Sequence, residues 1–444
     1  MPPSLIAPPI VPIAPSPMPD DPSRLLTAVF LLMLLADVTT RMLLMRRQIR
    51  HVDQHRGAVP PAFADTMTLA AHQRAADYTR ARMQLAMVET VSGALLALAL
   101  SLGGGLDALH AAWQAWFEAG SLAHGVALLA SVGVLGGLLD LPLMLYRTFG
   151  IEKRFGFNRM TPALFVADLA RQALIATLFG LPLLLAALWL MGATGERWWL
   201  WVWALWLGSN LLALLIWPTF IAPLFNTFTP LADAALQSRL QALLTRCGFQ
   251  ARGLFVMDGS RRSAHGNAYF TGFGAARRIV LFDTLLARLA PDEIEAVLAH
   301  ELGHFHHRHL ARRILVLAPG ALMLLALLGA LMQQPWFFAG LGMSGPHPDP
   351  ASALALFFIA LPAFSFMLTP LIHHWSRRHE YEADAYAARH SRATDLIAAL
   401  VKLYRDNAAT LTPDPLYSGF FDTHPPAALR VARLQALAPM ETRR

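Results

Sequence analysis

The chain has 444 residues, of which 55% are hydrophobic and 15% are charged, and its mean hydropathy is +0.44. This composition excludes a collagen-like, coiled-coil or wholly disordered chain, because it has no glycine period, no long charged heptad run and a high apolar content. It also argues against a soluble enzyme and favours a protein whose main solvent is lipid. The single cysteine, Cys247, excludes an intramolecular disulfide.

The first 23 residues contain nine of the 30 prolines and are expected to form a flexible, extended arm. Seven apolar runs follow, each about 20 residues long and therefore long enough to cross a bilayer as a helix. They occupy residues 25–45, 85–106, 122–146, 173–191, 198–224, 314–332 and 353–372. The sequence thus predicts a mainly α-helical, polytopic membrane protein.

The basic residues gather in alternate loops. Segments 46–84, 147–172, 225–313 and 373–444 hold 33 of the 36 Lys and Arg residues, whereas 107–121 and 333–352 hold none. Because basic loops stay in the cytoplasm, this predicts an N-terminus outside and a cytoplasmic C-terminus. It also explains the net charge of +7 without nucleic-acid binding. The preference for Arg over Lys indicates a bacterial source and hence the inner membrane, with the endoplasmic reticulum membrane as the alternative.

Several spans carry polar side chains that lipid disfavours, namely Asp37, Arg41, Glu89, Asp140 and Asn210. They indicate a polar or water-filled interior between the helices. Asp37 and Arg41 have an alternative explanation, because residues four apart on a helix can neutralise each other as a pair. The tryptophan-rich start of the fifth span is typical of anchoring at the membrane interface.

Segment 225–313 is too long for a connection and is expected to fold as a cytoplasmic, zincin-like α+β unit. Its pattern predicts a helix over 231–247 that ends at Gly248, and strands over 254–257, 267–273 and 278–282. Gly274 and a basic turn separate the last two strands. A further helix opens at Pro291 and is expected to run without a break into the sixth span.

That helix carries the sequence His300-Glu301-Leu302-Gly303-His304. Residues four apart share one helical face, so both imidazoles can reach one tetrahedral zinc ion, and Glu301 can accept a proton from the attacking water. The alternatives are a structural zinc or a coincidental match. We expect His306, His307 and His309 to form a hydrated polar face near the membrane surface, with no role in zinc binding.

A hydrolytic zinc site needs a third protein ligand and one open position. The chain returns to the same side of the membrane after the seventh span, where Glu380 and Asp384 lie four residues apart. Glu380 is expected to bind zinc, and Asp384 to accept a hydrogen bond from a zinc-binding histidine. His379 and Glu382 are weaker alternatives for the third ligand, and Glu382 is expected to point away from Glu380.

At these residues the sequence resembles the type I CAAX prenyl endopeptidase family, which comprises seven-span membrane zinc metallopeptidases. Besides the His-Glu-x-x-His motif, residues 72–78, 155–158, 262–274 and 278–286 carry the resemblance. It implies a ring of seven helices around a water-filled chamber, with an inward-facing zinc site near the cytoplasmic end. Zinc would be bound by His300, His304 and Glu380, and water would be activated by Glu301.

The resemblance also implies roles in substrate binding. Asn267 and its neighbour Ala268 would align an extended substrate as an added strand. His424 would stabilise the oxyanion, although without the resemblance its sequence context favours a surface histidine before a proline turn. Arg430 would hold the substrate or pair with a nearby carboxylate. The proline-rich arm has no counterpart in the family, and Glu382 stands where the family often has glutamine.

We therefore expect a monomeric zinc metalloendopeptidase in the lipid bilayer, with one zinc ion per chain. Its substrates would be prenylated proteins or, in a bacterium, other membrane-associated or misfolded proteins. The expected division is an arm (1–23), five spans with their loops (24–224), a metallopeptidase segment (225–313), two spans (314–372) and a closing segment with the third ligand (373–444). The alternatives are a metal transporter or channel and a catalytically silent scaffold.

Overall fold

The computed structural model of the chain describes residues 21–251, 253–271, 278–343 and 349–438. Within these residues, seven helices are long and apolar enough to cross a membrane, which confirms the predicted number of spans. Six of them have 31 residues or more. A helix of that length covers about 46 Å, whereas the hydrocarbon core of a bilayer is about 30 Å thick. The spans therefore continue beyond the lipid, where they carry the polar parts of the molecule.

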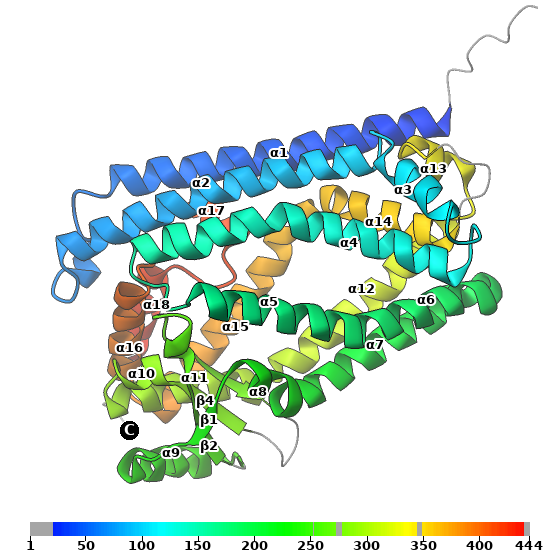
Figure 1. Cartoon of the computed structure of the whole chain (residues 1–444). Coiled ribbons are helices and arrows are strands. Elements are labelled where there is room, and N and C mark those ends of the chain that lie inside the picture. The colour runs from blue at the N-terminus through cyan, green and yellow to red at the C-terminus, as the bar shows by residue number, and fades with distance from the viewer. Residues whose placement is uncertain (1–20, 252, 272–277, 344–348, 439–444) are drawn as a thin grey trace, which may run out of the picture.

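The first three spans are α1 (Pro22–Gln54), α2 (Leu69–Leu100) and α4 (Leu122–Leu145), the last continued by the π-helical η2 (Tyr146–Glu152). The fourth span comprises α5 (Pro162–Ile175), η3 (Ala176–Gly180) and α6 (Leu181–Ala193). The fifth span comprises α7 (Trp198–Ile216), η5 (Trp217–Ile221) and α8 (Ala222–Phe225). The sixth is α12 (His309–Leu331), and the seventh joins α14 (Pro350–Ser365) to α15 (Thr369–His390). At one end of the bundle lie the short helices α3 (Gly105–Gln114) and α13 (Pro335–Gly340) (Figure 1).

Most spans begin earlier in the chain than predicted, and the second differs most, starting at Leu69 rather than near residue 85. Helix α1 starts at Pro22, inside the predicted arm, because Asp21 caps it by accepting a hydrogen bond from the Ser23 N–H and proline suits the first helical turn. The fourth span starts at Pro162 rather than near 173. Its charged residue Asp168 is paired with Arg171 and Arg262, which is why a polar stretch continues as helix.

A four-stranded sheet follows the fifth span, in the order β1-β2-β4-β3. Its strands are β1 (Phe228–Pro230), β2 (Gly253–Met257), β3 (Ala268–Thr271) and β4 (Arg278–Phe282). Strands β2 and β4 are parallel, and the two outer pairs are antiparallel. The predicted strands are present, while residues 272–273 and the turn at Gly274 lie outside the described part of the chain. The three-residue β1 was not predicted, because it is too short to show an alternating pattern.

One hydrophobic core joins this sheet to helices that are distant in the sequence. It contains Leu240 of α9 (Ala234–Arg246), Leu281 of β4, Leu298 of α11 (Pro291–His306), Ala387 of α15 and Leu434 of α18 (Ala427–Leu437). The elements α10 (Asp283–Leu286), α16 (Ala393–Asp406) and α17 (Pro415–Phe421) complete the same end of the molecule (Figure 1). The predicted metallopeptidase segment and the C-terminal segment therefore fold together.

The predicted continuous helix from Pro291 into the sixth span is wrong. Helix α11 ends at His306, and α12 begins at His309. Between them Arg308 has φ +54°, a left-handed backbone conformation that no helix continues through. The chain changes direction there, and His309 is brought back toward the end of α11.

Candidate functional site

Three side chains from two helices converge as a candidate metal centre. His300 and His304 of α11 and Glu380 of α15 each offer one ligand atom, and these atoms lie within 4.8 Å of one another. The two Nε2 atoms are 3.3 Å apart, and the Glu380 carboxylate oxygens lie 3.6 Å from His300 Nε2 and 3.5 Å from His304 Nε2. The spacing predicted from sequence therefore corresponds to a close triangle of donor atoms in the structure.

These residues fit a zinc ion. Ligands bound tetrahedrally at about 2.0–2.1 Å stand about 3.3 Å from one another, close to the separations found here. Two imidazoles and a carboxylate also match the chemistry that zinc prefers. In addition, Glu380 Oε2 is buried and has no hydrogen-bond partner, a costly arrangement that a bound cation would relieve.

Gly303 allows the two helices to approach closely enough for this triangle. A Cβ atom at this position would lie 2.8 Å from the Ala383 Cα and 3.0 Å from the Tyr386 Cβ, both on α15. No larger side chain could occupy that gap without moving backbone. The glycine inside the motif therefore sets the helix contact that brings Glu380 to the histidines.

Each metal-facing imidazole is held from its other side. His300 Nδ1 lies 2.9 Å from an Asp384 carboxylate oxygen. Asp384 in turn accepts two hydrogen bonds, of 2.9 and 2.6 Å, from the guanidinium of the buried Arg430. Arg430 Nη1 also lies 3.7 Å from Glu380. Of the two roles expected for Arg430, the structure shows the pairing with carboxylates. The Asp384 carboxylate in turn fixes the orientation of the His300 ring.

His304 is held by a contact that sequence reasoning missed. Its Nδ1 lies 2.9 Å from His309 Nδ1, and His309 Nε2 lies 2.9 Å from a Glu382 carboxylate oxygen. The prediction of a hydrated face is wrong for His309, which is 6% exposed. It is buried because the break at Arg308 places the start of α12 beside Glu382 and His379 of α15, and no helical periodicity signals such a break. Glu382 does point away from the metal centre, toward His309.

His306, His307 and His379 do not belong to the group of ligand atoms in the described part of the chain. His306 is exposed and His307 is partly exposed. His379, an alternative third ligand, stacks on His309 with ring centroids 4.0 Å apart.

Glu301 lines a cavity of about 360 Å³ together with His300, Glu380, His424 and Arg430. Burial is the main cause that raises the pKa of Glu301 above its ordinary value, which brings it toward the pH at which a carboxylate is an effective general base. Burial, followed by the neighbouring imidazole of His300, lowers the pKa of His304 to about 2. The His304 ring is therefore neutral, as a metal ligand must be.

The same cavity is bordered by an open strand edge. Asn267 and Ala268 line it, and β3 pairs only with β4 among the described strands. The Asn267 carbonyl accepts a hydrogen bond from the Phe282 N–H. Because hydrogen-bonded residues alternate along an antiparallel pair, Ala268 directs its backbone groups to the open side. His424 is 62% exposed, and its Nε2 lies 3.4 Å from Glu380.

Two further cavities lie between this site and the membrane part. The site cavity shares Tyr404, Asn407 and His424 with a cavity of about 550 Å³. That cavity shares Tyr417 and Phe421 with one of about 670 Å³ between α1, α2, α4 and α14. The three cavities therefore adjoin one another in sequence, from the metal centre into the bundle.

Some of the polar residues within the spans line the innermost cavity, and others do not. Asp37, Arg41 and Glu89 line the innermost cavity. Asp37 and Arg41 also pair with each other, so they both line an interior space and neutralise each other's charge. Glu89 pairs with Arg147. Asp140 and Asn210 are exposed and do not line it; the Asn210 side chain donates to the Trp206 carbonyl of its own helix.

Seven spans and a His-Glu-x-x-His helix facing a carboxylate as third ligand define a membrane-spanning metallopeptidase. The model described as CAAX prenyl protease N-terminal, five membrane helices, matches residues 48–227, and that of peptidase family M48 matches residues 230–438. The chain is 36% identical over 330 residues to CAAX prenyl protease 1 of Saccharomyces cerevisiae, covering 71% of this chain and 72% of that protein. It is 32% identical to the CAAX prenyl protease 1 homolog of Homo sapiens, with coverage of 69% and 72%.

The crystal structure of Ste24p from S. mikatae has a similar fold, with a TM-score of 0.85 and 30% sequence identity, covering 94% of this chain and all of that one. The chain therefore belongs to the type I CAAX prenyl protease family of M48 metallopeptidases. Membership of this family implies a metal at the site. The alternatives of a metal transporter and a silent scaffold are not supported.

Proposed function

We propose that this protein is a zinc endopeptidase that cleaves prenylated or other membrane-associated polypeptides at the site between α11 and α15. One catalytic zinc ion per chain is held by His300, His304 and Glu380. The ion supplies Lewis-acid polarisation of the attacking water and of the scissile carbonyl. The observation that carries the proposal is the ligand triangle, with a buried Glu380 oxygen that accepts no hydrogen bond, beside an open strand edge.

The chain's own groups perform the remaining steps. Glu301 accepts the proton of the attacking water and returns a proton to the leaving amine. The backbone of Ala268, beside Asn267, binds the substrate as an added strand. His424, at the open side of the cavity, donates a hydrogen bond to the oxyanion. Arg430 fixes Asp384 and hence the His300 ring, and it borders the substrate cavity.

The adjoining cavities support a lipidated or membrane-associated substrate. The innermost one lies among helices of the membrane part and is lined mostly by apolar residues such as Leu34, Val132 and Phe358. A prenyl chain or an apolar peptide segment would be shielded from water there. The burial of its apolar surface would contribute about 25 cal/mol of binding free energy for each Å². The relatives are named CAAX prenyl proteases, which accords with this chemistry.

We place the protein, as a monomer, in a bacterial inner membrane with its N-terminus outside and the peptidase site on the cytoplasmic side, because the basic loops lie at that end. The endoplasmic reticulum membrane is the alternative. In our division, segments 24–224 and 314–372 form the membrane part. Segments 225–313 and 373–444 form the catalytic part, and residues 1–23 lead into the first span.

The test is cleavage of quenched-fluorescence peptides by the full chain purified in detergent. We expect zinc-dependent cleavage that a chelator abolishes and added zinc restores. A prenylated peptide is expected to have a lower KM than the same peptide without the lipid. Cleavage that survives complete removal of metal would contradict the proposal, and equal kinetics with both peptides would remove the lipid preference alone.

A further inference from the structure

A second cluster of metal-ligating side chains lies at the opposite end of the molecule from the peptidase site. His110 of α3, His124 of α4 and Asp349, which caps α14, offer ligand atoms within 4.8 Å of one another. Their helices meet where α3 and α13 close the bundle (Figure 1), between loops that contain no Lys or Arg. The peptidase reaction uses none of these residues.

The hydrogen bonds of His124 leave one of its nitrogen atoms unsatisfied. Its Nε2 lies 3.1 Å from the His110 carbonyl oxygen. A carbonyl only accepts, so Nε2 carries the proton and Nδ1 of the neutral ring presents a lone pair. This Nδ1 has no hydrogen-bond partner, and His124 is 0% exposed. An orphaned acceptor in a fully buried ring is costly unless a cation reaches it.

The lone pair and the carboxylate lie near each other. His124 Nδ1 lies 4.0 Å from Asp349 Oδ2, too far for a hydrogen bond, and His110 Nδ1 lies 3.2 Å from the same oxygen. Ligand atoms bound tetrahedrally at about 2.1 Å to one ion stand about 3.4 Å apart. The His110 separation is close to that value, and the His124 separation exceeds it, so a small movement of the His124 ring or of the carboxylate would complete the site.

The surroundings hold these ligands in place. Asp349 Oδ1 accepts a hydrogen bond of 2.8 Å from the Ser352 N–H, which fixes the carboxylate at the start of α14. The His110 carbonyl orients the His124 ring, the arrangement usual for metal-bound histidines. Gly125, next to His124, allows close packing, because a Cβ atom there would lie 3.0 Å from the Ala351 Cβ.

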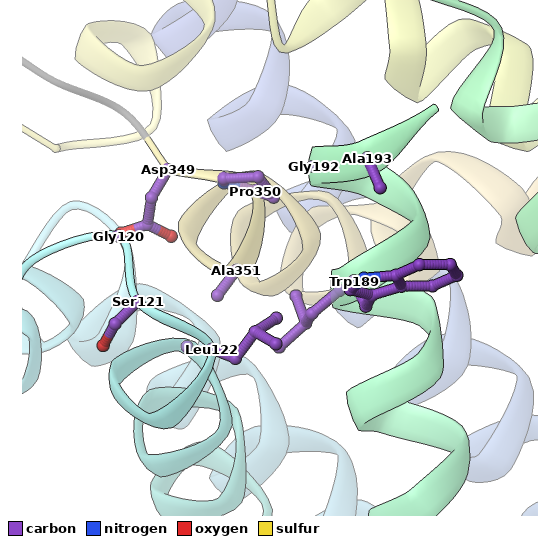
Figure 2. Close-up of a pocket in the computed structure, with 11 residues that line it drawn as sticks. Gly120, Ser121, Leu122, Trp189, Gly192, Ala193, Asp349, Pro350 and Ala351 are labelled. Carbon is purple, nitrogen blue, oxygen red and sulfur yellow. The ribbon is translucent and has the colours of Figure 1, made fainter. Parts of the chain in front are cut away.

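A pocket reaches Asp349, one of the three residues of the cluster. Asp349 lines an adjoining pocket of about 290 Å³ with Ser121 and Trp189 (Figure 2). The pocket leaves room for water as a further ligand. We propose that His110, His124 and Asp349 bind a divalent transition-metal ion, with zinc preferred for two imidazoles and one carboxylate, and that this ion ties α3, α4 and α14 together at the end remote from catalysis.

The test counts zinc in the full chain. Purified protein is stripped with a chelator, reloaded with zinc chloride, freed of excess by gel filtration and assayed by elemental analysis. His124→Gln and Asp349→Asn are each expected to bind one zinc ion fewer than the wild type and to cleave peptide within about twofold of its rate. Asn also caps helices, so Asp349→Asn removes charge while keeping the cap. Glu118→Gln, in the same exposed outer loop, is the control and is expected to keep the wild-type content.

Equal zinc content in the wild type and both variants would overturn the inference. Should either variant fail to fold, thermal unfolding decides the question in the His304→Ala background, which lacks one peptidase ligand. Zinc is expected to raise the Tm of that protein by several degrees, and the absence of a zinc-dependent rise would refute the second site.

Discussion

Two short series of polar contacts hold the imidazoles of the peptidase site. His300 is fixed by Asp384, which is itself fixed by Arg430, and His304 is fixed by His309, which is fixed by Glu382. Each ligand thus has its free nitrogen aimed at the metal position before any ion binds. Such preorganisation increases metal affinity, because less conformational freedom is lost on binding.

Replacement of Glu301 tests its role as the proton acceptor. Glu301→Gln keeps the shape and removes the basic group, so kcat is expected to fall by at least about 10²-fold, the typical share of a general base. Zinc content should be unchanged, because Glu301 is not a ligand. Asp292→Asn on the same helix, which alters only a surface ion pair, is the control and should retain activity. Near-normal turnover of Glu301→Gln would remove the assignment.

Replacement of His309 tests whether it positions His304. His309→Ala leaves all three ligands in place, yet the loss of the orienting contact is expected to weaken zinc binding by about 10–100-fold. Competition with a chromophoric chelator measures this affinity, and excess zinc should restore much of the cleavage. The exposed His306 provides the control, since His306→Ala should bind zinc as the wild type does. Equal affinities of the two variants would show that His309 serves packing alone.

At the scale of elements, the contact between α11 and α15 decides the site. The motif lies on one helix and the third ligand on another, about 80 residues later, and their separation is set by backbone packing at Gly303 rather than by the ligands. The break at Arg308 is equally important, since it separates the catalytic helix from the sixth span and returns His309 to the site.

Gly303→Ala is expected to destabilise the protein by about 1–3 kcal/mol, because the added methyl meets backbone of α15 and overpacks the interface. Zinc affinity and cleavage should fall with it, as Glu380 is pushed from the histidines. Thermal unfolding and zinc titration measure both effects. Gly320→Ala on α12, where an added Cβ has open space, gains the same helix propensity and should be neutral or slightly stabilising. A Gly303→Ala protein as stable and active as that control would contradict the close-contact argument.

At the scale of the whole molecule, the peptidase site adjoins cavities that reach between the membrane helices. The polar residues Asp37, Arg41 and Glu89 line the innermost of them. In the function that we propose, this innermost cavity shelters the apolar part of a substrate while the reaction takes place at the metal centre.

A larger side chain in the innermost cavity should weaken the binding of prenylated substrates more than that of unprenylated ones. Gly136 lines the innermost cavity, whereas Gly133 on the same helix is exposed and does not line it, and neither has an atom within 4 Å of an added Cβ. Gly136→Leu is therefore expected to raise KM several-fold for a prenylated peptide and to leave a short unprenylated peptide unaffected. Gly133→Leu is the matched control. Equal KM values for the prenylated peptide in both variants would show that the cavity does not hold the lipid.

The sequence by itself determined the spans, because lipid requires long apolar helices that composition reveals directly. It also predicted His300 and His304 as ligands and Glu301 beside them, because ligands four residues apart on one helix are a local property. Glu380 could be proposed because the spans return the chain to one side of the membrane. All of these follow from periodicity or topology, which need no knowledge of packing.

Only the tertiary structure decided which groups support the ligands and where the apolar space lies. The positions of His309 against His304 and Arg430 against Asp384 depend on a single left-handed residue and on helices that pack across long sequence separations. The same is true of His110, His124 and Asp349, which no motif connects. Contacts of this kind arise from the joint packing of distant segments, and a linear pattern carries no record of them.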